Sequence, residues 1–211
     1  MSELLVKAIE AHGGMDRWNR AIGITANLSI GGVLLDSKRQ SGVFGRVELE
    51  ADLHNQRVVL KHLGKSGLAA TFTPEQLTVQ ASTGEQIGVR PRPRDTFAEL
   101  DDWATWDLYH AAYFCGYAIW TYLTQPFLYA YPGFEVEEIE PWEEDKELLR
   151  RLKVKFPDTI ASHTREQISY FGEDGLLRRH DYAVDVLRGA QGANYAYDYR
   201  DRQGFKVPRY R

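Results

Sequence analysis

With 211 residues and a formal net charge of -4, the chain has the length of a single domain and a charge balance that argues against nucleic-acid binding. Its one cysteine, Cys115, excludes an intramolecular disulfide and a zinc site built from paired cysteines. The first residues, MSELLVKAIEAHGG, carry no basic stretch before an apolar core, which predicts a helix rather than a signal peptide. We therefore expect one domain over residues 1–211, a cytoplasmic location and no nucleic-acid partner.

The N-terminal residues predict two short helical segments. Ser2 is a residue type that caps helices, and Leu4, Leu5 and Ile9 lie on one face of a helix over residues 3–11. The glycines of HGG then end that helix. A helical turn, MDRWNRAI, follows, with Trp18 as its apolar anchor. An N-terminal helical layer is thus expected.

Most of the remaining chain is predicted to form short strands. Runs rich in β-branched and aromatic residues alternate with turn residues both before and after residue 108, and long helices between strands are rare. Such a pattern favours antiparallel hairpins over parallel units. We predict an α+β fold in which one strongly curved antiparallel sheet of roughly ten strands, an incomplete β-barrel, wraps around a central aromatic helix.

The central helix is predicted by an unusual stretch from Leu108 to Phe134, which contains no Asp, Glu, Lys or Arg. Only residues 109–123 read as continuous helix, because Pro126 and then Pro132 interrupt the pattern. The many tyrosines suit a membrane interface rather than a bilayer centre. The stretch therefore does not predict a membrane span.

Residues at helical spacing form two stripes along this helix. Small residues on one stripe allow close packing against a sheet, whereas large rings with hydroxyl or N–H groups on the other stripe need polar partners when buried. The second stripe fits either an ordinary core helix or the lining of a ligand chamber. The predicted ligand-binding residues on it are Trp106, His110, Tyr113, Tyr117 and Trp120.

A helix ending in AHGG, a tryptophan-containing turn, a meander of strands, the apolar segment PFLYAYPG and strands ending in GFKVP follow one another in this chain. This layout resembles the lipoprotein-carrier superfamily of LolA/LolB type. The resemblance implies a half β-barrel whose concave face is covered by helices and binds lipid acyl chains. Since this chain shows neither a signal peptide nor a lipobox cysteine, the resemblance implies an apolar-ligand chamber rather than lipoprotein transport. The chain also resembles a group of bacterial cytosolic proteins of no assigned activity that share stretches like AYFCGYAIWTYLTQPF and DGLLRRHDY.

One hairpin carries the candidate catalytic residues. If GEDGL forms a turn with Gly175 in the left-handed position, the strand register places Glu166 opposite Tyr182, with His180 and Arg178 on the same face. A carboxylate beside an imidazole orients a general base. His180, Glu166 and Tyr182 are therefore candidate catalytic residues and Arg178 a candidate ligand-binding residue, although a salt-bridged surface would show the same pattern.

Three functions remain open from the sequence. The first is binding of a small apolar or amphipathic molecule in the tyrosine- and tryptophan-lined cavity. The second is a cofactor-independent enzyme, such as an isomerase, cyclase or hydrolase, that uses His180 with Glu166, or His110, as acid or base. The third is a homodimeric interaction protein whose aromatic stripe is an interface. No cofactor and no metal site are expected, because no histidine spacing typical of a metal site occurs.

Overall fold

The computed structural model describes residues 1–101 and 103–211. These residues divide into two compact units, which we call the insert unit, Ile22–Leu123, and the terminal unit, Met1–Ala21 with Thr124–Arg211. The described residues form 13 strands and four α-helices, and every sheet is antiparallel. The predicted α+β class, with an N-terminal helix and an aromatic helix, is confirmed. The single domain over residues 1–211 stays a prediction.

The insert unit contains a six-stranded sheet in which each strand pairs with its neighbours in sequence. Apolar residues alternate along β2, as expected for a strand with one buried face. The first and last strands are the two edges, so the sheet is open. The strands are β1 (Gly23–Leu28), β2 (Val47–Asp52), β3 (Arg57–Leu63), β4 (Leu68–Phe72), β5 (Gln76–Gln80) and β6 (Gln86–Pro91).

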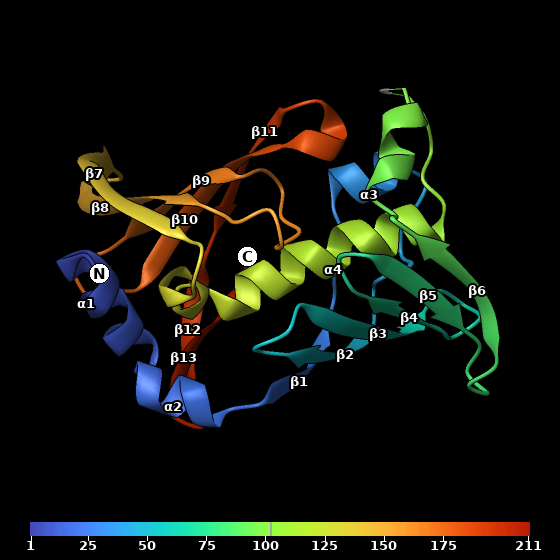
Figure 1. Cartoon of the computed structure of the whole chain (residues 1–211), viewed down its shortest axis with the longest axis horizontal. Helices are drawn as coiled ribbons and strands as arrows, with labels where there is room; N and C mark the ends of the chain where they lie inside the picture. The colour runs from blue at the N-terminus through green and yellow to red at the C-terminus, as the bar shows by residue number, and fades with distance from the viewer. Residues whose placement is uncertain (102) are drawn as a thin grey trace. The chain divides into compact units, whose positions relative to one another are not determined.

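The aromatic helix α4 (Leu108–Thr124) runs along one face of this sheet (Figure 1). Gly116 allows the close approach, because a Cβ there would lie only 2.6 Å from the ring of Phe72. The indole N–H of Trp120 donates to the carbonyl oxygen of Asp52 at 2.7 Å. The predicted helix over residues 109–123 is therefore confirmed, while the short helices α3 (Val33–Ser37) and η1 (Asp95–Glu99) were not predicted.

The terminal unit contains a five-stranded sheet in the order β11-β10-β9-β8-β7 and a separate hairpin of β12 and β13. The acidic run that begins at Glu135 forms one of the two edge strands, where charged side chains discourage pairing with other chains. The strands are β7 (Glu135–Glu144), β8 (Glu147–Lys155), β9 (Glu166–Phe171), β10 (Leu177–Val184), β11 (Ala190–Tyr195), β12 (Tyr197–Arg202) and β13 (Phe205–Tyr210).

Short helices complete the terminal unit, and α1 lies alongside β8 and β13 (Figure 1). The hydroxyl of Ser2 accepts the backbone N–H of Leu5 at 3.2 Å, which confirms the predicted cap. The indole of Trp18 stacks on Phe127 at 4.3 Å and donates to the hydroxyl of Tyr131, so it anchors this layer as predicted. The helices are α1 (Glu3–His12), α2 (Met15–Arg20), η2 (Phe127–Ala130) and η3 (Asp185–Leu187).

The strands differ from the prediction in one respect, because they form three separate sheets rather than one continuous sheet. The described part of residues 92–134 is loop and helix, so β6 and β7 are far apart in sequence. Because each strand pairs with its neighbours in sequence, the first sheet ends before this segment and the second sheet begins after it.

Candidate ligand-binding site

A group of buried polar side chains lies on one face of β9 and β10 in the terminal unit. Ser169 pairs with His180 across these strands, and Gln167 pairs with Tyr182. Residues directly opposite each other in an antiparallel pair share a face, so these four side chains lie together. With three residues from neighbouring segments they form what we call the polar cluster: Gln125, Tyr129, His163, Gln167, Ser169, His180 and Tyr182.

Hydrogen bonds connect the polar cluster to the segment that follows α4. The amide nitrogen of Gln125 lies 3.0 Å from Nδ1 and 3.3 Å from Nε2 of His180. The hydroxyls of Tyr129 and Ser169 are 2.7 Å apart. Both Ser169 and His180 have no exposed surface. Polar groups buried to this extent are costly unless they are hydrogen-bonded, so the arrangement fixes residues 125–129 against the sheet.

Aromatic rings surround these polar groups. The imidazole of His163 stacks on Tyr182 with 3.9 Å between ring centroids, and His180 meets the same ring edge-on at 5.1 Å. Gly192, which pairs with Tyr182 on β11, leaves space for this ring, because a Cβ there would lie 2.5 Å from it. On the other side, Tyr129 packs edge-on against Phe156. The polar cluster is therefore set among apolar rings.

Burial keeps the side chains of His180 and Tyr129 uncharged near neutral pH. Burial, with smaller contributions from the charges of Arg211 and His163, holds the pKa of His180 well below its ordinary value. Burial also raises the pKa of Tyr129, although its hydrogen bond with Ser169 acts in the opposite direction. Since His180 is neutral, it can accept or donate a hydrogen bond but cannot attract an anion by its charge.

Two buried oxygens in the polar cluster lack partners. The side-chain oxygens of Gln125 and Gln167 make no hydrogen bond within the described residues. The orientation of the Gln167 amide is fixed, because its nitrogen donates to the carbonyl oxygen of Thr164 at 2.7 Å. A buried acceptor without a donor costs about 1–3 kcal/mol. These oxygens are therefore points at which a bound donor would be favourable.

The structure does not bring Glu166 to His180. Glu166 is exposed, pairs with Lys155 in the sheet and forms an ion pair with Lys153 at 3.0 Å. The predicted register is wrong by one residue because β10 contains a bulge at Arg178, between the pairs that Leu177 and Arg179 make with β9. A shift of one residue moves a side chain to the opposite face of a sheet.

Arg178 itself is held by acidic neighbours rather than directed into the polar cluster. Its guanidinium lies 2.9 Å from the carboxylate of Asp174 and 3.4 Å from that of Glu147. Of the predicted residues on this hairpin, the structure therefore brings His180 and Tyr182 together and leaves Glu166 and Arg178 elsewhere. Their catalytic or ligand-binding roles stay predictions.

The opposite face of this sheet is covered by alternating arginines and aromatic rings. Arg151 lies 5.6 Å from the ring centroids of both Trp142 and Tyr170, and Arg179 lies 5.0 Å from Tyr170 and 5.5 Å from Tyr195. The carboxylates of Glu144 and Asp181 neutralise the charge of Arg179, and Arg151 donates to the carbonyl oxygen of Glu140. This face is a structural layer, and the polar cluster lies on the opposite face.

In the insert unit, His110 belongs to the cap of α4. Asp107 accepts the backbone N–H of His110 at 2.9 Å, and Nδ1 of the imidazole lies 3.4 Å from the backbone nitrogen of Asp107. This reciprocal pattern is a capping box with histidine in the third position. Arg90 donates to the same carboxylate at 3.0 Å. Burial lowers the pKa of His110, while the charge of Asp107 acts against this.

The other predicted residues of the aromatic stripe are all buried within the insert unit. Tyr113 packs edge-on against Phe72 at 5.4 Å and against Tyr117 at 5.3 Å. Trp106 meets Phe97 edge-on at 5.5 Å. These contacts make the stripe part of the packed layer between α4 and the sheet. That the stripe also lines a ligand chamber stays a prediction.

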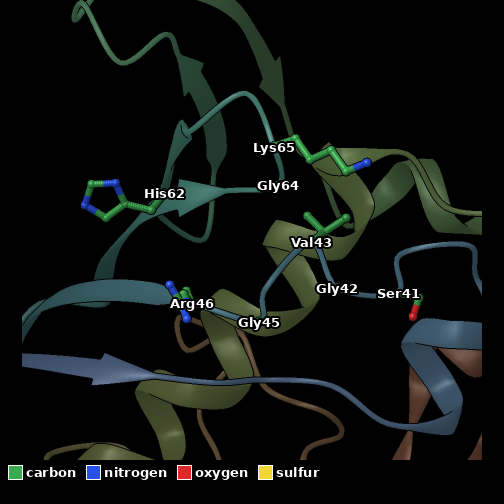
Figure 2. A pocket seen from close by; sticks show the side chains of 8 residues that line it. All are labelled: Ser41, Gly42, Val43, Gly45, Arg46, His62, Gly64 and Lys65. Atoms are coloured by element: carbon green, nitrogen blue, oxygen red, sulfur yellow. The ribbon is translucent and has the colours of Figure 1, made fainter.

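An open surface pocket of about 540 Å³ also lies in the insert unit (Figure 2). Figure 2 shows the side chains of His62 and Lys65 directed away from each other on either side of it. Basic side chains that diverge do not provide the convergent contacts of a small-molecule site. The pocket is lined by Ser41, Gly42, Val43, Gly45, Arg46, His62, Gly64 and Lys65.

A metal site and a reactive cysteine have little support in the described part of the chain. There, no group of three or more His, Cys, Asp or Glu side chains is arranged to hold a metal ion. Burial raises the pKa of the Cys115 thiol to about 12, which leaves it without nucleophilic thiolate at neutral pH. Across residues 1–101 and 103–211, every helix is too short or too polar to span a membrane.

The layout of the chain is similar to that of a solved structure. A LolA superfamily protein from Nitrosomonas europaea is similar in structure with a TM-score of 0.48 and 9% sequence identity, over 97% of this chain and 80% of that chain. No family model and no curated protein matches the sequence.

Sequence reasoning missed most of the polar cluster. Gln125 is a polar residue inside an apolar segment, which was a usable signal, but its partner His180 lies 55 residues away. Gln167 and Ser169 alternate on β9, and they would have been found had the bulge at Arg178 been known. No short motif marks His163, which reaches Tyr182 from a loop.

Proposed function

We propose that the chain binds a small amphipathic molecule, with the apolar part against the aromatic rings of the terminal unit and the polar end at the polar cluster. The observation that carries this proposal is a fully buried hydrogen-bonding group, centred on His180 and Ser169, that is set among aromatic side chains. Small-molecule sites typically combine an apolar lining with a few convergent polar groups. The buried aromatic rings Tyr129 and Phe156 supply such a lining beside the cluster.

The enzymatic alternative gains no specific support from the geometry. Its proposed pair, Glu166 and His180, is separated in the structure, and Nδ1 of His110 is engaged in the cap of α4. A binding role requires only that the polar cluster contact a ligand. Binding is therefore the function that the arrangement supports best.

A titration with N-phenylnaphthylamine, an uncharged dye whose fluorescence rises in apolar surroundings, tests the proposal. We expect saturable binding of one dye per chain that decanol displaces. Because His180 lies at the centre of the polar cluster, His180→Ala should weaken decanol binding about three- to tenfold while the chain stays folded.

The matched control is His62→Ala at an exposed histidine of the insert unit, which should leave decanol binding unchanged. Far-ultraviolet circular dichroism of both variants would establish that the effect is not unfolding. Dye fluorescence that rises linearly without saturation, and that decanol does not reduce, would contradict a binding function.

A further inference from the structure

The polar cluster offers a ligand more acceptors than donors. The oxygen of Gln167 is buried and lacks a partner within the described residues, and the amide nitrogen on the same side chain is already donating to Thr164. Gln167 is only 1% exposed, so bulk water does not reach it. The side-chain oxygen of Gln125 is also buried and without a partner, while its amide nitrogen lies 3.0 Å from Nδ1 of His180.

Gln125, Gln167, Ser169 and His180 also provide no charge that could pair with an anionic ligand. None of the seven residues of the polar cluster is Asp, Glu, Lys or Arg, burial keeps His180 neutral, and the imidazole of His163 is stacked on the ring of Tyr182. On the strands that form the cluster, Arg179 lies on the opposite face and is held by Asp181 and Glu144. Moving an ionised carboxylate into such surroundings without a cation is strongly unfavourable.

Arg211 is the cation to consider, because its charge contributes to the lowered pKa of His180. Its side chain is exposed and donates to the side-chain oxygen of Asn194 at 2.9 Å. A carboxylate bound to Arg211 would remain at the exposed edge near β11 and would leave the buried oxygen of Gln167 without a donor. Arg211 therefore defines the competing arrangement that an experiment must distinguish.

We propose that the polar end of the ligand is an uncharged hydrogen-bond donor, a hydroxyl or an amide N–H, that binds the buried side-chain oxygens of Gln167 and Gln125. This inference rests on the proposed binding function and specifies the class of ligand. It favours long-chain alcohols and amides over fatty acids of the same length, because a carboxylate has no hydrogen to donate and its charge would be desolvated.

Displacement of N-phenylnaphthylamine by three ligands of equal chain length tests this inference on the unmodified protein. Decanol, decanamide and decanoate are compared at about pH 8, where the carboxylate is ionised. We expect decanol and decanamide to bind about tenfold or more tightly than decanoate, the difference that one well-placed hydrogen bond to a buried partner provides.

Two variants locate the effect. Gln167→Leu and Gln125→Leu should each weaken decanol binding about five- to tenfold and leave decanoate binding nearly unchanged. Gln191→Leu makes the same substitution at an exposed glutamine of β11 and should change neither.

The outcomes separate the two proposals. Decanoate that binds as tightly as decanol would overturn the inference and indicate binding at Arg211. Decanol binding that is unchanged in both folded glutamine variants would also overturn it, since the oxygens would then be satisfied by internal water. If none of the three ligands displaces the dye, the proposed function itself fails, and this inference fails with it.

Discussion

Replacing Trp120 by glutamate is expected to unfold the chain. Trp120 is 1% exposed, and its indole donates to the carbonyl oxygen of Asp52 on the sheet that α4 covers. The substitution removes a large buried ring, at about 3–5 kcal/mol, and places a carboxylate in an apolar layer. Together these losses approach the whole stability of a typical domain, about 5–15 kcal/mol. Circular dichroism and size-exclusion chromatography should show an unfolded or aggregated protein.

The control is the same substitution at Trp103, which is 92% exposed. Trp103→Glu should change the free energy of unfolding by less than about 0.5 kcal/mol, as surface substitutions usually do. The comparison also tests the interface alternative for the aromatic stripe. A folded, monomeric Trp120→Glu protein with an unchanged melting temperature would show that this ring belongs to an interface rather than to a packed layer.

The second large effect is a loss of stability in mild acid. Burial is the main reason that the pKa of His12 is lowered from 6.5 to about 4, and the hydrogen bond to the carbonyl of Ala8 only partly opposes it. The pKa of His180 is lowered in the same direction. In the unfolded chain both residues have their ordinary pKa of about 6.5.

The direction in which stability changes with pH follows from proton binding. Between about pH 6.5 and pH 4 the unfolded chain binds more protons than the folded chain, so stability falls as the pH falls through this window. His12 alone accounts for about 3 kcal/mol over that range, at about 1.4 kcal/mol per pKa unit. Urea denaturation at about pH 7, 5.5 and 4.5 should show this decline.

His12→Gln should flatten this decline, because glutamine can still donate to Ala8 but does not titrate. His54→Gln at an exposed histidine is the control and should retain the wild-type decline. If His12→Gln loses as much stability between pH 7 and pH 4.5 as the wild type, the acid sensitivity does not come from burial of His12.

Local patterns predicted α1, α2 and α4 and the hairpin turn at Gly175. An apolar run predicted α4 to within one residue at each end, and GEDGL predicted the hairpin turn in which Gly175 has a φ of 78°. The backbone N–H of Gly172 donates to Leu176 across that turn, as expected. These features depend on residues close together in sequence, so the sequence is sufficient to predict them.

The composition of the site depended on contacts between distant segments. A single bulge at Arg178 placed Gln167 opposite Tyr182 in place of the predicted Glu166. Arg178 at the bulge is held by Glu147 on another strand, a contact that no local pattern indicates. In the same way, Gln125 contacts His180 because the segment that follows α4 packs on the sheet. The candidate site could therefore be predicted only in part.

Native mass spectrometry of the purified protein, followed by solvent extraction of anything released, tests the central claim of ligand binding most directly. We predict a monomer that carries a small molecule, and we predict that the extracted compound has a long apolar part and an uncharged hydroxyl or amide end. A chain of bare mass that neither carries a small molecule nor takes up decanol when it is added would contradict the claim and leave the polar cluster with a structural role.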